Sequence, residues 1–132
     1  MVGEENIIAS CTIPSSGSSY CYNEDGSFTA TADGASCQVQ IDGQIPYSLT
    51  GVTQDGPMVG IAASVDGSDQ AQWGTDVLEP AGSSSVPISL DALINVAAGS
   101  TVKFGVMLDG NSSWAGKTLN IAGSYLCFEG EF

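Results

Sequence analysis

Residues 99–110 read Gly-Ser-Thr-Val-Lys-Phe-Gly-Val-Met-Leu-Asp-Gly, and they carry the clearest structural pattern in the chain. Apolar side chains recur at every second position, at Val102, Phe104, Val106 and Leu108. A period of two is typical of a β-strand with one buried face. Asp109-Gly110 then supplies a dipeptide that readily adopts the positive φ angles of tight turns. The segment therefore predicts a half-buried strand that ends in a turn.

The same alternation occurs along most of the chain. Further alternating sets are Cys37, Val39 and Ile41; Ile45, Tyr47 and Leu49; Val59, Ile61, Ala63 and Val65; and Val86, Ile88 and Leu90. The last segment, 118–128, is apolar on both faces from Tyr125 to Phe128. A strand of that kind is expected to be covered on both sides, by its own core and by a partner subunit.

Turn dipeptides separate these segments. Asp-Gly occurs at positions 25, 33, 42, 55, 66 and 109, and the first five recur at intervals of 8 to 13 residues. This spacing is typical of short strands in a β-sandwich or barrel. One segment also has helical spacing, at Leu90, Leu93, Ile94 and Ala97, and its extended alternative is a strand over residues 85–96. The surrounding β pattern favours an extended strand with a kink near Asp91.

Length and charge exclude several classes of function. The chain has 132 residues, enough for one domain, and its 15 acidic residues against two lysines give a net charge of −13. Such a surface repels nucleic acid and anionic membranes, so neither is expected as a partner. Histidine is absent, which removes the usual base of serine hydrolases. We therefore predict no enzyme, no catalytic residue, no cofactor and no metal, although residues 23–27 and 66–69 place several oxygen atoms in short loops.

The four cysteines are Cys11, Cys21, Cys37 and Cys127. The N-terminus is acidic where a secretion signal is basic, and no apolar stretch approaches the roughly 20 residues of a membrane span. In the absence of a recognisable signal we expect reduced thiols that line the core. A Cys11–Cys21 bridge that closes the serine-rich loop is the most plausible exception.

The N-terminal part of the chain has two interpretations. Residues 1–22 are predicted to form an arm and a serine-rich loop, and residues 23–132 the sandwich domain. Ile7, Ile8 and Ile13 make this arm apolar, so it either adds to a neighbour's sheet or forms the first strand of its own sandwich.

Two tryptophans lie in turn-like sequence. Trp73 precedes Gly-Thr-Asp, and Trp114 lies in the run 111–117. Each either caps one end of the core or binds a protein or a sugar ring.

Residues 85–128 resemble the second half of a jelly-roll domain of the tumour-necrosis-factor/complement-C1q type. The resemblance rests on Ser-Val-Pro-Ile-Ser-Leu at 85–90, on the step Ala-Ala-Gly-Ser-Thr-Val-Lys-Phe at 97–104, and on the closing Leu-Asn-Ile-Ala-Gly-Ser-Tyr-Leu at 119–126. Ser100 stands where that family usually has Asp. The resemblance implies an antiparallel β-sandwich of jelly-roll (TNF/C1q-like) type that forms a homotrimer, with its last strand near the threefold axis.

Capsid decoration (cement) proteins of tailed bacteriophages are similar in architecture. The sequence hypothesis is therefore a trimeric decoration protein that binds the major capsid protein of a phage head, on the virion exterior after synthesis in the host cytoplasm. The alternative is a trimeric carbohydrate- or receptor-recognition domain of a fibre or secreted protein. The residues expected to make the interactions are Ile7, Ile8, Ile13, Trp73, Trp114, Tyr125, Phe128 and Phe132.

Overall fold

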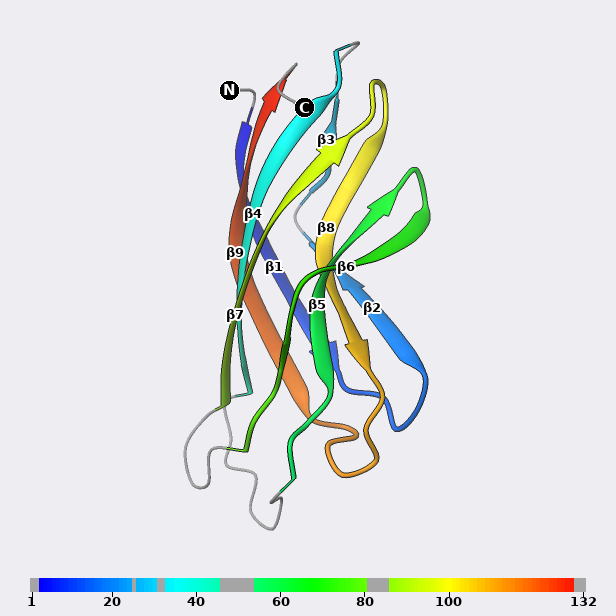
Figure 1. Cartoon of the computed structure of the whole chain (residues 1–132), viewed down its shortest axis with the longest axis vertical. Helices are drawn as coiled ribbons and strands as arrows, with labels where there is room; N and C mark the ends of the chain where they lie inside the picture. Colours follow the sequence, from blue (N-terminus) through cyan, green and yellow to red (C-terminus); the bar gives the residue numbers. More distant parts are fainter. Residues whose placement is uncertain (1–2, 25, 31–32, 46–53, 81–85, 130–132) are drawn as a thin grey trace.

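The computed structural model describes residues 3–24, 26–30, 33–45, 54–80 and 86–129, which are all strand, turn or loop. In these ranges no helix is long and apolar enough to cross a membrane. The strands are β1 (Gly3–Thr12), β2 (Ser18–Tyr22), β3 (Phe28–Thr29), β4 (Ala35–Ile45), β5 (Met58–Val65), β6 (Ser68–Val77), β7 (Val86–Val96), β8 (Thr101–Asp109) and β9 (Thr118–Glu129) (Figure 1).

The strands form two antiparallel sheets that pack face to face. One sheet has the order β1-β9-β4-β7 and the other β2-β8-β5-β6, with β3 added to β8. The chain crosses repeatedly between the two sheets, so strands distant in sequence become neighbours, and β1 pairs with β9 over its full length. This is the antiparallel β-sandwich of jelly-roll type that the sequence predicts.

The alternating residues meet in one core between the sheets. Val102, Phe104, Val106 and Leu108 of β8 are at most 1% exposed, and the alternating residues of β4, β5 and β7 join the same cluster. Tyr47 and Leu49 lie outside the described residues. The alternation therefore predicted correctly which side of β4, β5, β7 and β8 faces inward.

Residues 86–96 form one extended strand. All eleven residues of β7 pair with β4, from Val86 opposite Ile45 to Val96 opposite Ala35. Leu93 is 61% exposed, although helical spacing would group it with the buried Leu90 and Ile94. The prediction of an extended strand is confirmed. Pairing with β4 along the whole strand supplies hydrogen-bond partners for the backbone N–H and C=O groups, which a helix would pair internally.

The turn predictions are confirmed at one Asp-Gly pair and wrong at another. Asp66 and Gly67 join β5 to β6 with φ angles of 49° and 87°, as a two-residue hairpin turn requires. Asp42 and Gly43 instead lie inside β4. A Cβ at Gly43 would be 3.0 Å from side-chain atoms of Ile88 and Leu119, so this glycine provides space for close packing.

The N-terminal segment is part of the sandwich and does not project from it. Residues 3–12 form β1, whose register with β9 runs from Gly3 opposite Cys127 to Thr12 opposite Thr118. Ile7 and Ile13 are each 1% exposed in the core. The serine-rich loop leads directly into β2, which pairs with β8. The interpretation as the first strand of its own sandwich is the one that the structure shows.

The prediction of reduced thiols is wrong. Cys11 is bonded to Cys21 and Cys37 to Cys127, so the chain has no free cysteine. Cys37 and Cys127 lie directly opposite each other on β4 and β9, and both side chains point into the core. The register between β4 and β9 brings these two residues together. The expected exception, Cys11–Cys21, is confirmed and links β1 of one sheet to β2 of the other.

Candidate functional site

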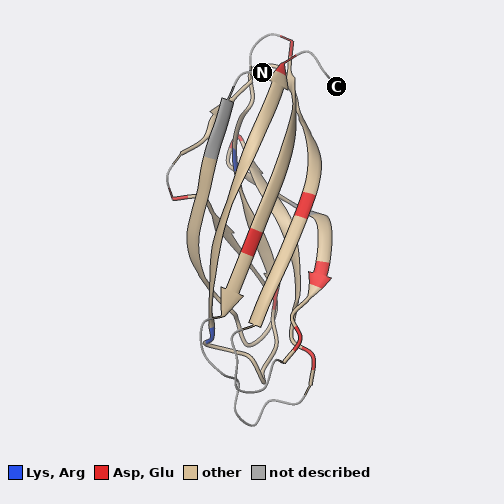
Figure 2. Cartoon of the chain, turned by 90° about the vertical axis from the view of Figure 1, so that its left-hand side faces the viewer, with Lys and Arg blue, Asp and Glu red and all other residues tan. Residues whose placement is uncertain are grey.

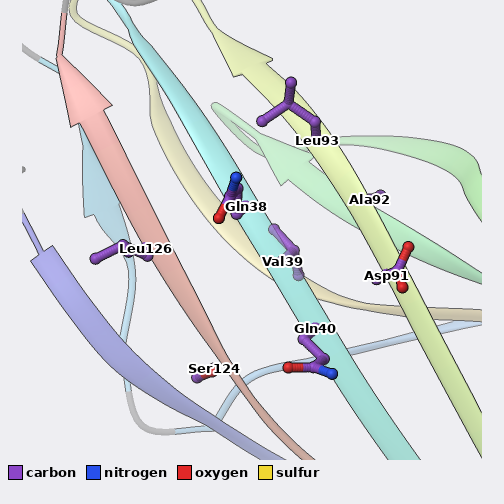
Figure 3. A pocket seen from close by; sticks show the side chains of 8 residues that line it. All are labelled: Gln38, Val39, Gln40, Asp91, Ala92, Leu93, Ser124 and Leu126. Atoms are coloured by element: carbon purple, nitrogen blue, oxygen red, sulfur yellow. The ribbon is translucent and has the colours of Figure 1, made fainter.

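The outer face of the four-stranded sheet carries its outward side chains in rows across the strands. Gln38 lies opposite Leu126 of β9 and Leu93 of β7. The next row places Gln40 opposite Ser124 and Asp91. A shallow groove of about 520 Å³ lies over these two rows (Figure 3). Its polar side chains are two amides and one hydroxyl, which both donate and accept hydrogen bonds, and one carboxylate, which accepts them. Two leucines also line the groove.

A second groove, of about 570 Å³, lies on the same face over the other half of the sheet. Four of its polar side chains are paired across strands. Ser89 Oγ donates to Asp42 Oδ1 at 2.8 Å, and Ser10 Oγ donates to Asn120 Oδ1 at 3.0 Å. Ile8 lies on its rim beside these pairs and is 48% exposed.

The described side chains of this face carry little charge, although the chain has a net charge of −13. Among the described side chains that point outward from the sheet, Asp42 and Asp91 are the charged ones. Figure 2 looks onto this sheet and shows how little of it is acidic. The two most exposed of the large hydrophobic side chains, Leu93 and Ile8, also lie here. The described part of this outer face is therefore weakly acidic and partly apolar.

The predicted interaction residues divide between this face and the core. Tyr125 is 2% exposed, and its ring packs on Phe104 with the centroids 4.9 Å apart. Phe128 and its neighbour Leu126 lie on the outer face and are half-buried. Ile8 shares that face, whereas Ile7 and Ile13 belong to the core. Phe132 lies outside the described residues.

The two tryptophans are packed against the body of the sandwich. Trp114 is 0% exposed, and its Nε1 donates to the carbonyl oxygen of Gln54 at 3.2 Å. It therefore caps one end of the core and presents no surface to a partner. Trp73 is half-buried on β6, opposite Ile61, at a shift in the strand register. It packs against the core cluster and leaves only part of its ring accessible.

A pair of tyrosines lies on the outer face of the other sheet, where the sequence analysis expected a loop. Tyr20 and Tyr22 of β2 have ring centroids 6.2 Å apart and planes inclined by 19°. Tyr22 Oη donates to Asp69 Oδ1 at 2.6 Å. Burial, and then the hydrogen bond and the negative charge of Asp69, raise the pKa of Tyr22 well above its usual range. The sequence pattern that could have predicted this pair is Tyr-Cys-Tyr, because an inward Cys21 places both tyrosines on the outer face.

The floor beneath the tyrosine pair consists of small residues. Tyr22 lies opposite Gly105, which in turn lies opposite Ala62. Because Asp69 is on β6, two strands away from β8, the Tyr22 side chain must extend across this floor to reach it. Ala62 and Met107 are at most 2% exposed although they lie outside the core cluster. Tyr20, Tyr22 and Asp69 are called the tyrosine platform below.

The described side chains offer few candidates for a metal site. No group of three or more His, Cys, Asp or Glu that could hold a metal ion occurs within the described ranges. Every buried side-chain nitrogen and oxygen atom in those ranges has a hydrogen-bond partner. The arrangement offers two outer surfaces, one grooved and weakly charged and one aromatic, for contact with other molecules.

The comparisons with known proteins show the fold alone. No family model and no curated protein matches the chain in sequence. An arabinose-bound α-L-arabinofuranosidase superposes with a TM-score of 0.52 and 16% identity over 96% of this chain, which spans 22% of that enzyme's chain. The globular domain of a zebrafish complement 1qA protein gives 0.43 and 11%, with 96% of this chain and 98% of that one covered. A family 35 carbohydrate-binding module from Clostridium thermocellum gives 0.36 and 16%, with 96% and 91% covered.

Proposed function

We propose that the chain is a non-catalytic recognition domain that assembles as a homotrimer through the outer face of its four-stranded sheet. The observation that carries this proposal is the contrast between that partly apolar face, whose described side chains include only two carboxylates, and the net charge of −13. Copies of so acidic a chain repel each other, so they approach most easily where charge is least. Interface cores are likewise depleted of charged residues.

Exposed apolar residues support the same surface. Leu93, which is 61% exposed, stands beside the groove of about 520 Å³, and Ile8 stands on the rim of the other groove. A neighbouring copy therefore meets both projecting apolar side chains and hollows that can receive them. The number three for the subunits rests on the resemblance of residues 85–128 to TNF/C1q-like jelly rolls.

The disulfides favour a protein that folds in an oxidising compartment. Cys11–Cys21 and Cys37–Cys127 account for all four cysteines, and such bonds persist mainly outside the cytosol. This supports the recognition domain of a fibre or secreted protein over the capsid decoration protein. Capsid decoration stays a hypothesis, which predicts that the purified chain co-sediments with phage heads and raises their resistance to heat.

Light scattering coupled to size exclusion tests the assembly. We expect a particle of three times the chain mass of 13.4 kDa at micromolar concentration. Leu93→Asp, which adds a charge on β7 at the groove of about 520 Å³, should convert it to monomer. Ser113→Asp adds the same charge in the exposed turn at 110–117 and should leave the trimer intact. A monomeric wild type, or a trimer that tolerates Leu93→Asp, would overturn the proposal.

A further inference from the structure

The tyrosine platform has a shape that suits a flat, partly apolar ligand. Tyr20 is 39% exposed, and its ring runs nearly parallel to that of Tyr22, at 19° between planes. The Tyr22 ring is held over the small residues Gly105 and Ala62 by the hydrogen bond from its Oη to Asp69. The Tyr22 ring is thus positioned by the fold before any ligand arrives, which lowers the entropic cost of binding.

Side chains of both positive and negative charge border this platform. Lys103 of β8 lies opposite Ser64 of β5, and Ser64 lies opposite Asp69 of β6. This row is next to the row that contains Gly105 and Ala62, two residues along each strand. Lys103 and Asp69 are exposed, and Ser64 is half-buried between them. The row therefore offers an ammonium donor, a hydroxyl and a carboxylate acceptor within one stretch of surface.

We infer that the tyrosine platform binds a neutral pyranose residue of a glycan, with Lys103 and Asp69 as hydrogen-bonding partners of its hydroxyl groups. A pyranose presents C–H bonds on one ring face, which pack on aromatic rings, and hydroxyls at its edge, which both donate and accept. Opposite charges in the bordering row balance each other, so the site favours a ligand without net charge. The inference deepens the proposed function, because it names what the second sheet would recognise.

Two other ligand classes fit the same surface less well. An anionic sugar would approach Asp69 on a chain of net charge −13. A cationic group would find the aromatic faces and Asp69 favourable, but Lys103 lies in the same row and repels it. Neutral glycans meet neither penalty.

Isothermal titration of the full chain tests the inference. The probes are the neutral trisaccharides of β-1,4-linked glucose, galactose and xylose and of α-1,4-linked glucose, together with trigalacturonate and tetramethylammonium. We expect binding of at least one neutral trisaccharide and none of the two charged probes. Tyr20→Ala should weaken that binding by roughly ten-fold, the loss expected for one aromatic contact. Tyr20→Phe, which keeps the ring, should bind as the wild type does.

Two further variants separate the possible failures. Asp69→Asn should weaken sugar binding, because the amide is a weaker acceptor than the carboxylate, while circular dichroism shows whether the sandwich is intact. Leu93→Asp lies on the opposite sheet and should bind the sugar with unchanged affinity whether or not the chain is still a trimer. Sugar binding by a monomeric chain would overturn the proposed assembly and leave this inference standing. No binding of any neutral trisaccharide, binding of tetramethylammonium alone, or sugar binding that survives Tyr20→Ala would overturn the inference.

Discussion

The indole ring of Trp114 lies directly against the backbone of Gly56, at a distance that leaves no room for a side chain. A Cβ at position 56 would lie 2.7 Å from two ring carbons of the indole. The ring is held in place by its hydrogen bond to the carbonyl oxygen of Gln54, and it has no exposed surface. One glycine and one tryptophan thus close this end of the sandwich together.

Gly56→Ala should lower the free energy of unfolding by about 1 to 3 kcal/mol, the usual cost of adding a methyl group to a packed site. Gly26→Ala is the matched control, because nothing lies within 4 Å of a Cβ at that position. Urea unfolding followed by tryptophan fluorescence measures both. Equal stability of the two variants would contradict the contact between Gly56 and Trp114.

Ile7 and Ile8 are adjacent on β1 and point to opposite faces, at 1% and 48% exposure. Ile7→Ala should cost about 2 to 5 kcal/mol of unfolding free energy, since it opens a cavity in the core. Ile8→Ala, made in the Leu93→Asp chain in which the proposed interface is broken, should change it by only about 0.5 kcal/mol, as is usual for a surface position. Deletion of residues 1–9 should accordingly unfold the chain, because β9 would lose most of its pairing with β1. A truncated chain that stays folded would show that β1 is dispensable.

The two disulfides should contribute unequally to stability. They join residues separated by 10 and by 90 positions. The loop-entropy model makes the longer closure more stabilising by about 2 kcal/mol. We therefore expect the double variant Cys37→Ala/Cys127→Ala to unfold at lower urea concentration than Cys11→Ala/Cys21→Ala. Thermal midpoints of the wild type that are unchanged by reductant would instead indicate that the thiols are reduced, as the sequence analysis expected.

Stability at high pH should depend on Tyr22. Its pKa in the folded chain is raised above the ordinary 10.0 by burial first and by Asp69 second. The stability that the protonated phenol contributes is therefore complete below pH 10 and is lost as the pH rises above it. Urea unfolding between pH 8 and 11 should show a steeper decline for the wild type than for Tyr22→Phe. Parallel curves for the two proteins would contradict the burial and hydrogen bond of this phenol.

Strand positions and their buried faces were predictable, because alternation is a local property that the sandwich preserves. Apolar residues alternate from Val102 to Leu108, and the four of them at even-numbered positions lie in the core. The turn prediction at Asp42-Gly43 was wrong because a local dipeptide does not report which side chains surround it in the fold. A dipeptide that suits a turn also suits a strand interior when a neighbouring side chain, here Leu119, needs the space of a missing Cβ.

Features that depend on register between distant strands were not predictable. Cys37 meets Cys127 only because β4 and β9 are neighbours with that particular pairing. The tyrosine platform likewise needs β2, β8, β5 and β6 in that order before Tyr22 can reach Asp69. A hydrogen bond across 47 positions leaves no local pattern in the sequence.

The position of the Cys37–Cys127 bond has a mechanical consequence. β1 begins and β9 ends at the same end of the sandwich (Figure 1), so a tether attached to both ends of the chain would peel these two strands apart. Tension that passes this point would run through the covalent link and bypass residues 38–126, which include four of the nine described strands in full, β5 to β8. The faces formed by β5 to β8 would keep their shape under a load that had already stripped away the N-terminal strand.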